Sequence, residues 1–435
     1  MMRMLYAYYG DDFTGSTDVL ETLACGGVRA ALFLATPTQD DVAVFPELQA
    51  VGIAGDSRSR TPEWMSAHLP ELFGVLNRFG APVTHYKTCS TFDSSPQIGS
   101  IGRAMEIGID VFSPEFVPIV VGAPHLGRFV AFGNLFAAAG GEVYRIDRHP
   151  TMSKHPVTPM LEADLRRHLA FQTSLPIGLL DLRNLHPEGL DSVMVERPAA
   201  VLFDTVDTAP LEMVGRLIWG RARERAVFAV GSSGLTESLI PAWRLEGLIG
   251  EAPAPIAAQP VEQIVVLSGS CSPVTQGQIE WALANGFHGI RVDPTALIRD
   301  STGPLAEAMD CLRVGGSPVL YTALGPLEGT VAHSAKLGIA FGQLLKGLIA
   351  NSSARRVVLC GGDTSSHAMQ QLPIRALSWA APLALGAPLC RAHAPGTIFD
   401  GLELALKGGQ VGQVDFFRRA LGRRALIVAT PHRVS

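Results

Sequence analysis

The stretch that decides the fold is residues 5–18, LYAYYGDDFTGSTD, near the start of a chain of 435 residues. It begins with a short apolar run of the kind that forms a buried strand. Residues 16–24, which overlap its end, space their apolar side chains as a helix does. Gly26 and Gly27 then give a stop signal for that helix. A strand that leads straight into a helix is the unit from which α/β proteins are built.

The same alternation runs along the whole chain. We predict further strands at residues 30–34, 50–54, 83–87, 117–121, 178–181, 200–203, 226–230, 264–267, 289–292, 319–322 and 356–359. We predict further helices at residues 62–79, 97–106, 161–169, 273–285 and 330–349. Residues 252–260, APAPIAAQP, interrupt the pattern with three prolines, which is typical of a linker. We therefore expect an α/β protein of two domains, residues 1–251 and 261–435, with mainly parallel sheets and an interdomain cleft.

Composition narrows the class of protein. Hydrophobic residues make up 47% of the chain and charged residues 17%, which is enough apolar material for large cores and too little charge for a disordered chain. A net charge of -5 without any basic run argues against nucleic-acid binding. We expect no transmembrane helix and no secretory leader, because no apolar run is long enough for either. Six scattered cysteines fit reduced thiols, so we expect a cytoplasmic protein.

The most specific polar motif is the pair Asp11 and Asp12, which follows the first predicted strand. Chemistry in open α/β sheets lies at the carboxyl ends of the strands. Two adjacent carboxylates there can hold Mg²⁺ or accept the proton of a substrate hydroxyl. Asp12, Thr14 or Ser16 would also serve as a helix cap, and one such role is expected. A cap needs only one acid, so the pair favours a functional site.

Basic residues follow several other predicted strands. Lys87, one of only five lysines, ends a strand and precedes hydroxyl residues, which suits an anionic ligand such as a carboxylate. Arg58 follows another strand, and Arg128 and Lys154 lie in two later polar loops. The alternative for each is an ordinary surface charge or, for Lys87, the approach to a helix that starts near Pro96. Together these residues indicate a cationic pocket for a small anion.

Three loops of small residues lie in the second half of the chain: SGSCSP at 268–273, CGGDTSS at 360–366 and KGG at 407–409. Backbone N–H groups of such loops bind phosphates at helix N-termini. Tight turns also need glycine, so one loop would be weak evidence, but three in one domain favour a nucleotide. Neither a Walker-type loop nor the standard dinucleotide fingerprint occurs. Acids and cations in one domain, with phosphate-binding loops in the other, suggest phosphoryl transfer.

With the motif GDDFTGSTD at 10–18, the SGSCSP and CGGDTSS loops resemble, in this order, the four-carbon acid sugar kinase family, over nearly the whole chain. The resemblance implies an N-terminal sugar-acid domain and a C-terminal ATP domain. It implies a kinase that uses ATP and Mg²⁺ to phosphorylate a terminal hydroxyl of a short acid sugar, such as threonate or a 3-oxo-tetronate. The stretch KTCSTFDSSP at 87–96, with SKHPVTP at 153–159, departs from the common family form and resembles the 3-oxo-isoapionate kinase branch.

The resemblance also implies roles for single residues. The catalytic candidates are Asp12 and Asp11, and it assigns no residue to a metal. The substrate-binding candidates are Arg58, Lys87, Arg128 and Lys154. The ATP-binding candidates are Ser268, Ser270, Gly361, Gly362, Asp363, Thr364 and Gly408. The expected partners are an acid sugar and ATP, without nucleic acid or membrane, and with a second copy of the chain as a further candidate.

Two other interpretations stay open at this point. A Mg²⁺-dependent lyase or aldolase could use Asp11 and Asp12, with the glycine loops merely structural. A non-catalytic binder of small ligands would bind without turnover. Absence of ATP binding would favour the lyase, and ligand binding without turnover would favour the binder.

Overall fold

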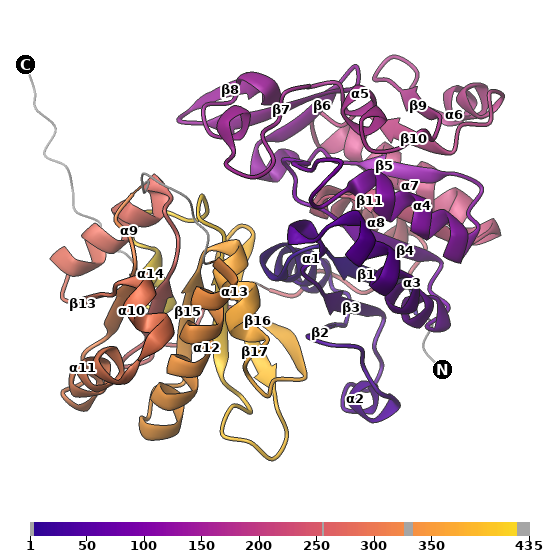
Figure 1. Ribbon diagram of the computed structural model, residues 1–435. Helices are drawn as coiled ribbons and strands as arrows, with labels where there is room; N and C mark the ends of the chain where they lie inside the picture. The colour runs from indigo at the N-terminus through magenta and orange to yellow at the C-terminus, as the bar shows by residue number, and fades with distance from the viewer. Residues whose placement is uncertain (1–3, 255, 326–333, 424–435) are drawn as a thin grey trace, which may run out of the picture. The chain divides into compact units, whose positions relative to one another are not determined.

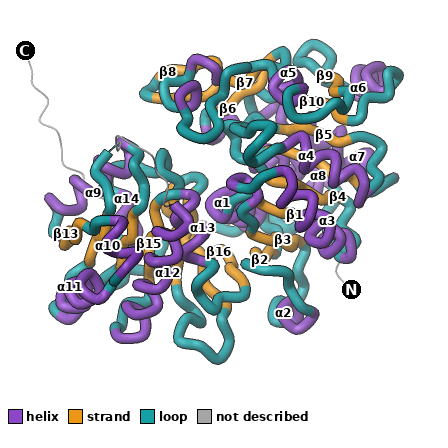
Figure 2. The backbone as a smooth tube through the Cα atoms, in the orientation of Figure 1, coloured by secondary structure: helices purple, strands orange, loops and turns teal. Residues whose placement is uncertain are grey.

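The computed structural model describes residues 4–254, 256–325 and 334–423. Its backbone divides into two compact units. The first unit holds the chain up to Ala254 together with the segment Ile374–Trp379, and the second unit holds the rest. Figures 1 and 2 show that strands in each unit lie among covering helices. Both units are α/β with mainly parallel strands, which confirms the predicted fold class.

The first unit is built on a sheet of eight parallel strands in the order β2-β3-β1-β4-β11-β5-β10-β9. The bounds are β1 (Tyr6–Gly10), β2 (Ala30–Phe33), β3 (Ala50–Ala54), β4 (Val83–Lys87), β5 (Val117–Val120), β9 (Ile177–Leu180), β10 (Ala200–Phe203) and β11 (Val227–Gly231). Most of these strands are buried along their whole length, as parallel strands covered on both faces must be. The apolar runs in the sequence therefore predicted the ends of each of these eight strands to within a residue or two. The segment 374–379 adds an antiparallel pair, in which Ala376 lies opposite Phe33.

Five of the eight helices described in this unit form two packed groups. The eight are α1 (Phe13–Cys25), α2 (Gln39–Ala43), α3 (Pro62–Arg78), α4 (Ile101–Phe112), α5 (Leu165–Ala170), α6 (Pro187–Met194), α7 (Thr208–Glu224) and α8 (Ser233–Leu245). Helices α1, α7 and α8 pack together, as do α3 and α4. The crossovers β1–α1–β2 and β3–α3–β4 run in opposite directions along the sheet, so right-handed connections place α1 and α3 on opposite faces. Tyr9 and Tyr86, stacked at 5.9 Å, lie in the core under α3.

A small antiparallel sheet interrupts the parallel pattern of the first unit. Its strands are β6 (Arg128–Ala131), β7 (Asn134–Ala139) and β8 (Glu142–Arg145). The turn at Phe132 and Gly133 has positive φ at both residues, which is the geometry of a tight hairpin. Asp204, at the end of β10, accepts hydrogen bonds from the N–H groups of Phe132 (2.6 Å) and Gly133 (2.9 Å). Asp204 thus fixes the hairpin whose first strand carries Arg128.

The second unit has the strand order β13-β14-β12-β15-β18-β17, with β17 antiparallel to β18. The bounds are β12 (Val265–Ser268), β13 (His288–Arg291), β14 (Pro318–Tyr321), β15 (Arg356–Cys360), β16 (Ala376–Ala384), β17 (Ala387–His393) and β18 (Glu403–Lys407). The helices are α9 (Pro273–Ala284), α10 (Pro294–Arg299), α11 (Thr302–Arg313), α12 (Ser334–Asn351), α13 (Gly362–Met369) and α14 (Phe416–Ala420). The predicted start of α12 at residue 330 lies outside the described residues. Within the described ranges, no helix has the length and apolar character needed to cross a membrane.

Candidate functional site

The strand ends of the first unit bring its polar motifs to one edge of the sheet. Gly10 of β1 lies in register with Ala54 of β3 and with Lys87 of β4. Lys87 in turn lies in register with Gly231 of β11. The residues that follow these positions therefore emerge side by side at the carboxyl edge, where ligands bind in open α/β sheets. Asp11 is one of them.

Asp12 caps the N-terminus of helix α1. It is the N-cap residue, and one of its carboxylate oxygens accepts a hydrogen bond from Gly15 N at 2.5 Å. Its other oxygen accepts from Thr14 Oγ1 at 3.2 Å and from Arg58 Nη1 at 3.0 Å. The predicted capping role is confirmed. With three donors engaged, the carboxyl group of Asp12 is held in one orientation.

Asp11 is buried, and within the described residues only its backbone forms hydrogen bonds. Its N–H donates to Lys87 O at 2.9 Å, and its carbonyl accepts from Arg58 N at 3.1 Å. Its Oδ1 has no hydrogen-bond partner among the described residues. Burial, and then the negative charge of Asp12, raise the pKa of Asp11 to about 7, although Arg58 and Lys87 oppose the shift. A carboxyl group in this state gains and loses a proton near neutral pH, which suits a general base.

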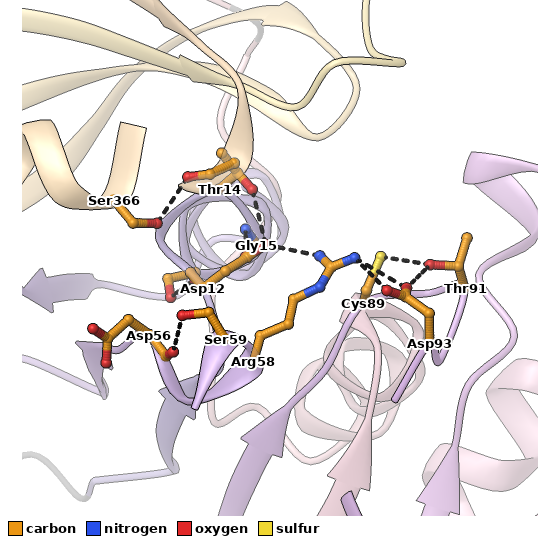
Figure 3. A network of polar contacts seen from close by, with 12 residues as sticks. Asp12, Thr14, Gly15, Asp56, Arg58, Ser59, Cys89, Thr91, Asp93 and Ser366 are labelled. Atoms are coloured by element: carbon orange, nitrogen blue, oxygen red, sulfur yellow. Dashed lines mark hydrogen bonds and ion pairs between the residues drawn. The ribbon is translucent and has the colours of Figure 1, made fainter. Parts of the chain in front are cut away.

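Arg58 lies between two carboxylates, as Figure 3 shows. Its Nη1 contacts Asp12 at 3.0 Å, and its Nη2 contacts both oxygens of Asp93 at 3.0 and 2.8 Å. Burial works against the guanidinium charge, but Asp93 and then the nearby Cys89 and the other acids outweigh it, so the pKa of Arg58 is raised above its ordinary value. For Asp93, burial is likewise outweighed by Arg58 and His155, so its pKa is lowered. The structure therefore places Arg58 in an ion-pair network.

The other three predicted cations lie in different surroundings. Lys87 is only 2% exposed and forms no ion pair in the described part of the chain. A Cβ at position 15 would lie 2.6 Å from Lys87 Nζ and 2.7 Å from Asp12 Oδ1, so glycine is needed there to let both groups approach α1. Arg128 donates to the carbonyls of Leu126 and Gly127, and burial lowers its pKa. Lys154 is exposed, in the short 3₁₀ turn Met152–Lys154.

Sequence reasoning missed Asp93 and its neighbours as parts of this site. Cys89 lies near both guanidinium groups, those of Arg58 and Arg128. Thr91 Oγ1 contacts Cys89 Sγ at 2.9 Å and Asp93 Oδ1 at 2.5 Å (Figure 3). The signal was present in the one acid within the run of hydroxyl residues after Lys87. It could not be interpreted without knowing that the loop folds back toward Arg58.

The second unit brings three small-residue loops together at its own strand ends. A Cβ at Gly269 would lie 2.4 Å from Thr364 Oγ1, so the first loop touches the start of α13. A Cβ at Gly409 would lie 2.8 Å from Ser270 Oγ, so the third loop touches the first. The predicted residues Ser268, Ser270 and Thr364 are all buried here. The convergence of three loops far apart in sequence makes one surface rich in backbone N–H groups.

The start of α13 lacks a side-chain cap. Its N-cap residue is Gly361 with φ 110°, a conformation that favours glycine, and no side chain among the described residues caps the first N–H groups of the helix. These free donors come from Gly362, Asp363 and Thr364, the residues predicted to hold phosphates. The hydroxyls of Ser268 and Ser365 are buried and have no hydrogen-bond partner within the described residues. An uncapped helix N-terminus with spare donors is a site for an anionic group.

Lys407 and Gly408 shape the third loop. Lys407 Nζ is buried and donates to Thr275 Oγ1 at 2.9 Å, Gly408 O at 3.0 Å and Val411 O at 3.2 Å. Burial lowers the pKa of Lys407, yet the three acceptors satisfy its ammonium group. Thr275 Oγ1 also donates to Gly409 O at 2.8 Å. Lys407 therefore holds the glycine loop in shape and is not directed at a phosphate.

Metal ligands are sparse at both sites. No group of three or more His, Cys, Asp or Glu side chains in the described ranges is arranged to hold a metal ion. Asp363 is exposed in the first turn of α13. A divalent cation here would need oxygen ligands from a bound phosphate chain to complete its coordination.

Comparison with known proteins gives matches along the whole chain. A model of a sugar-binding N-terminal domain matches residues 6–239, and a model of a nucleotide-binding C-terminal domain matches residues 265–417. A 3-oxo-isoapionate kinase of Paraburkholderia graminis is 45% identical, with 95% of this chain and 93% of that protein covered. A 3-oxo-tetronate kinase of Methylobacterium radiotolerans is 32% identical, with 98% and 100% covered. A Haemophilus influenzae protein of known structure is 23% identical with a TM-score of 0.71, covering 96% of this chain and 99% of that one, so it shares the fold.

Proposed function

Because this chain belongs to the four-carbon acid sugar kinase family, we propose that it transfers the γ-phosphoryl group of ATP to a terminal hydroxyl of a short acid sugar. The reaction forms a bond between the sugar oxygen and the γ-phosphorus and breaks the bond from that phosphorus to ADP. The hydroxyl loses its proton in the same step. The protein must therefore supply a proton acceptor, hold a carboxylate and hold a phosphate chain.

Asp11 is the proton acceptor in this proposal. The observation that carries it is a buried carboxyl group at a strand end that has a free oxygen and a pKa near 7. Asp12 is already bonded to Gly15, Thr14 and Arg58, so it orients the start of α1 and the guanidinium group. Separate environments give two neighbouring acids separate roles.

Lys87 and Arg128 are the cations left to bind the substrate's carboxylate. Both are at least partly buried, and neither has an acidic partner in the part of the chain that the structure describes. A buried cation without a counter-ion is costly, and an anionic ligand relieves that cost. Arg58 contributes its charge to the same region while its hydrogen bonds go to Asp12 and Asp93. Lys154, exposed in the turn Met152–Lys154, is proposed to contact the part of the substrate beyond its carboxylate.

The second unit holds the phosphates of ATP in this proposal. The N–H groups of Gly362, Asp363 and Thr364 contact phosphate oxygens, with Ser268 and Ser270 as neighbouring hydroxyl donors. Gly408 lies in the loop that completes the surface. Mg²⁺ would neutralise the charge that develops on the phosphates, and Asp363, in the first turn of α13, would be the carboxylate available to join its coordination.

Among short acid sugars, a 3-oxo acid is the proposed substrate, with 3-oxo-isoapionate first. Identity to the 3-oxo-isoapionate kinase is 45%, against 32% for the 3-oxo-tetronate kinase of Methylobacterium radiotolerans. The stretch at 87–96 lines the site at Cys89 and Asp93, so a change of sequence there reaches the substrate region.

The first experiment is a coupled ADP-release assay with ATP, Mg²⁺ and a panel of acid sugars with four or five carbons and their 3-oxo forms. Turnover of one 3-oxo acid, with kcat/KM at least about tenfold above the others, is the expected result. Binding of ATP without turnover of any member would keep the nucleotide site and overturn the substrate. No binding of ATP, with cleavage of a sugar acid in its absence, would overturn the kinase in favour of a lyase.

A further inference from the structure

Asp93 is a buried charged residue at the strand ends of the first unit, and the proposed reaction gives it no role. Its side chain is fully buried. It accepts hydrogen bonds from Arg58 Nη2 at 3.0 and 2.8 Å, from Thr91 Oγ1 at 2.5 Å and from Thr158 Oγ1 at 3.0 Å. These donors come from three separate segments, after β3, after β4 and before α5. One carboxylate thus joins three loops at the carboxyl edge of the sheet.

The contacts of Asp93 determine where Arg58 lies. An unattached arginine side chain samples many rotamers, and ordering it costs conformational entropy. Here Nη2 is held by both oxygens of Asp93 while Nη1 reaches Asp12, so the guanidinium plane is fixed at both ends (Figure 3). Such a fork cannot be reproduced by a single point charge. Removing Asp93 would leave Arg58 free to leave Asp12 or to bind the substrate's carboxylate itself.

Thr158 connects the same carboxylate to the segment that follows Lys154. Thr158 Oγ1 lies 3.0 Å from His155 Nδ1, and Thr158 N donates to that nitrogen at 3.1 Å. The side chain of Thr158 is buried, whereas Lys154 is exposed. The link from Asp93 to Thr158 therefore anchors an otherwise polar and mostly exposed loop to the site.

We propose that Asp93 is a positioning residue for the kinase reaction: it fixes Arg58 against Asp12 and anchors the loop at Thr158, so that Lys87 and Arg128 receive the substrate's carboxylate. This inference rests on the proposed function. It gives Arg58 the role of holding the site in shape, and it gives Lys87 and Arg128 the role of binding the substrate's carboxylate. Loss of Asp93 then acts on turnover of the acid sugar and leaves ATP binding in the second unit unchanged.

The test compares Asp93→Asn with two matched variants on the acid sugar that the wild-type protein turns over best. Asp93→Asn keeps the shape and removes the charge, so kcat/KM for the acid sugar is expected to fall about 10²-fold, with KM for ATP within about twofold of wild type. Thr158→Val removes only the loop anchor and is expected to cost about threefold to tenfold. Arg58→Lys removes the fork. The double variant Arg58→Lys with Asp93→Asn is expected to be worse than Arg58→Lys alone by no more than the loss seen in Thr158→Val, because Asp93 acts only through Arg58 and the Thr158 anchor.

The pH profile separates positioning from a general loss of structure. Asp11 is surrounded by Asp12, Arg58, Lys87 and Asp93, and Asp93 contributes to raising its pKa. Removing the charge of Asp93 should therefore move the acid limb of kcat/KM to lower pH, whereas a merely structural defect would lower activity at every pH alike.

Each outcome decides the inference. An unshifted limb, or kcat/KM for Asp93→Asn within threefold of wild type, would overturn the positioning role and leave the kinase intact. A wild-type protein that turns over no acid sugar would overturn both. If Asp93→Asn does not fold, kcat/KM for Arg58→Lys within threefold of wild type would overturn the inference, because that variant breaks the same fork.

Discussion

The strand ends of the first unit carry charges, whereas those of the second unit carry glycine and serine. In the first unit, Asp11, Asp12, Arg58 and Asp93 form a network whose behaviour depends on which carboxyl groups are ionised. In the second unit, the start of α13 offers backbone N–H groups that cannot titrate. Both sites are suited to anions on the same kind of scaffold, but one uses side-chain charge and the other uses backbone geometry.

This difference has a direct chemical reason. A phosphate chain is recognised by its many oxygens, so a surface of N–H donors is sufficient to hold it. A hydroxyl that must lose its proton needs a group with a matched pKa, which only a side chain in a particular environment supplies. Substitutions that change charge should therefore act in the first unit, and substitutions that change backbone freedom should act in the second.

The largest effect is expected for Asp11→Asn. The amide keeps the size of the carboxyl group but cannot accept the proton, so kcat for the acid sugar should fall about 10³-fold with KM for ATP unchanged. The measurement is steady-state ADP release with each substrate varied in turn. Asp56→Asn is the matched control, because Asp56 is also buried after a strand of the same sheet but bonds to Arg60, and it should lose less than fivefold. Equal losses for the two variants would remove Asp11 from the chemistry.

A smaller effect, on the other substrate, is expected for Gly361→Ala. At φ 110° an alanine is strained, so the start of α13 must shift and KM for ATP should rise about 10-fold to 100-fold. Gly396→Ala is the control, since Gly396 also has positive φ (76°) but has open space around it, away from the three loops. Binding of the acid sugar in the absence of ATP, measured by calorimetry, should not change. A loss of acid-sugar affinity in Gly361→Ala would contradict the separation of the two sites.

The pH dependence should belong to the first unit. With the pKa of Asp11 raised to about 7, the base is ionised above that pH and protonated below it. At saturating ATP, kcat/KM for the acid sugar should therefore lose about tenfold per pH unit on the acid side of 7. A profile measured from pH 5.5 to 8.5 checks this. A profile that stays flat down to pH 5.5 would show that the base is an ordinary, solvated carboxyl group.

The sequence predicted the parallel strands well and the antiparallel ones poorly. Buried parallel strands are apolar along their whole length, so β1, β3 and β4 stand out as continuous runs. Strands β6 and β8 have only four residues each, and β8 is half-exposed, so their composition is that of a loop. The turn at Gly140 and Gly141, both with positive φ, was the available sign of a hairpin.

The site was predictable only as far as it follows from strand ends. Asp11, Asp12, Arg58 and Lys87 lie at or shortly after the ends of strands that are neighbours in the sheet, so α/β topology places them together. Asp93 depends on a loop in which Phe92 adopts positive φ (56°), a conformation that the sequence does not announce. Arg58 and Asp93 are 35 positions apart in the sequence, so their ion pair could be recognised only from the structure. The choice of Asp11 over Asp12 as the base likewise needed the hydrogen bonds.

The smallest expected effect is a gain in thermal stability for Asp11→Asn, the variant that is also expected to lose the most activity. The folded protein binds the Asp11 proton more tightly than the unfolded chain does, because burial and Asp12 raise its pKa to about 7 from 3.8. The contribution of Asp11 to stability is therefore complete below about pH 4 and is lost as the pH rises to 7, where the folded state holds a buried charge. Asp11→Asn removes that charge, so the Tm of the first unit should rise by about 2–5 °C at pH 8, and the gain should narrow toward pH 5. Thermal melts at the two pH values measure this. A Tm gain of the same size at pH 8 and at pH 5 would mean that packing, not ionisation, causes it. Asp11 would then not be the residue whose buried charge destabilises the folded state.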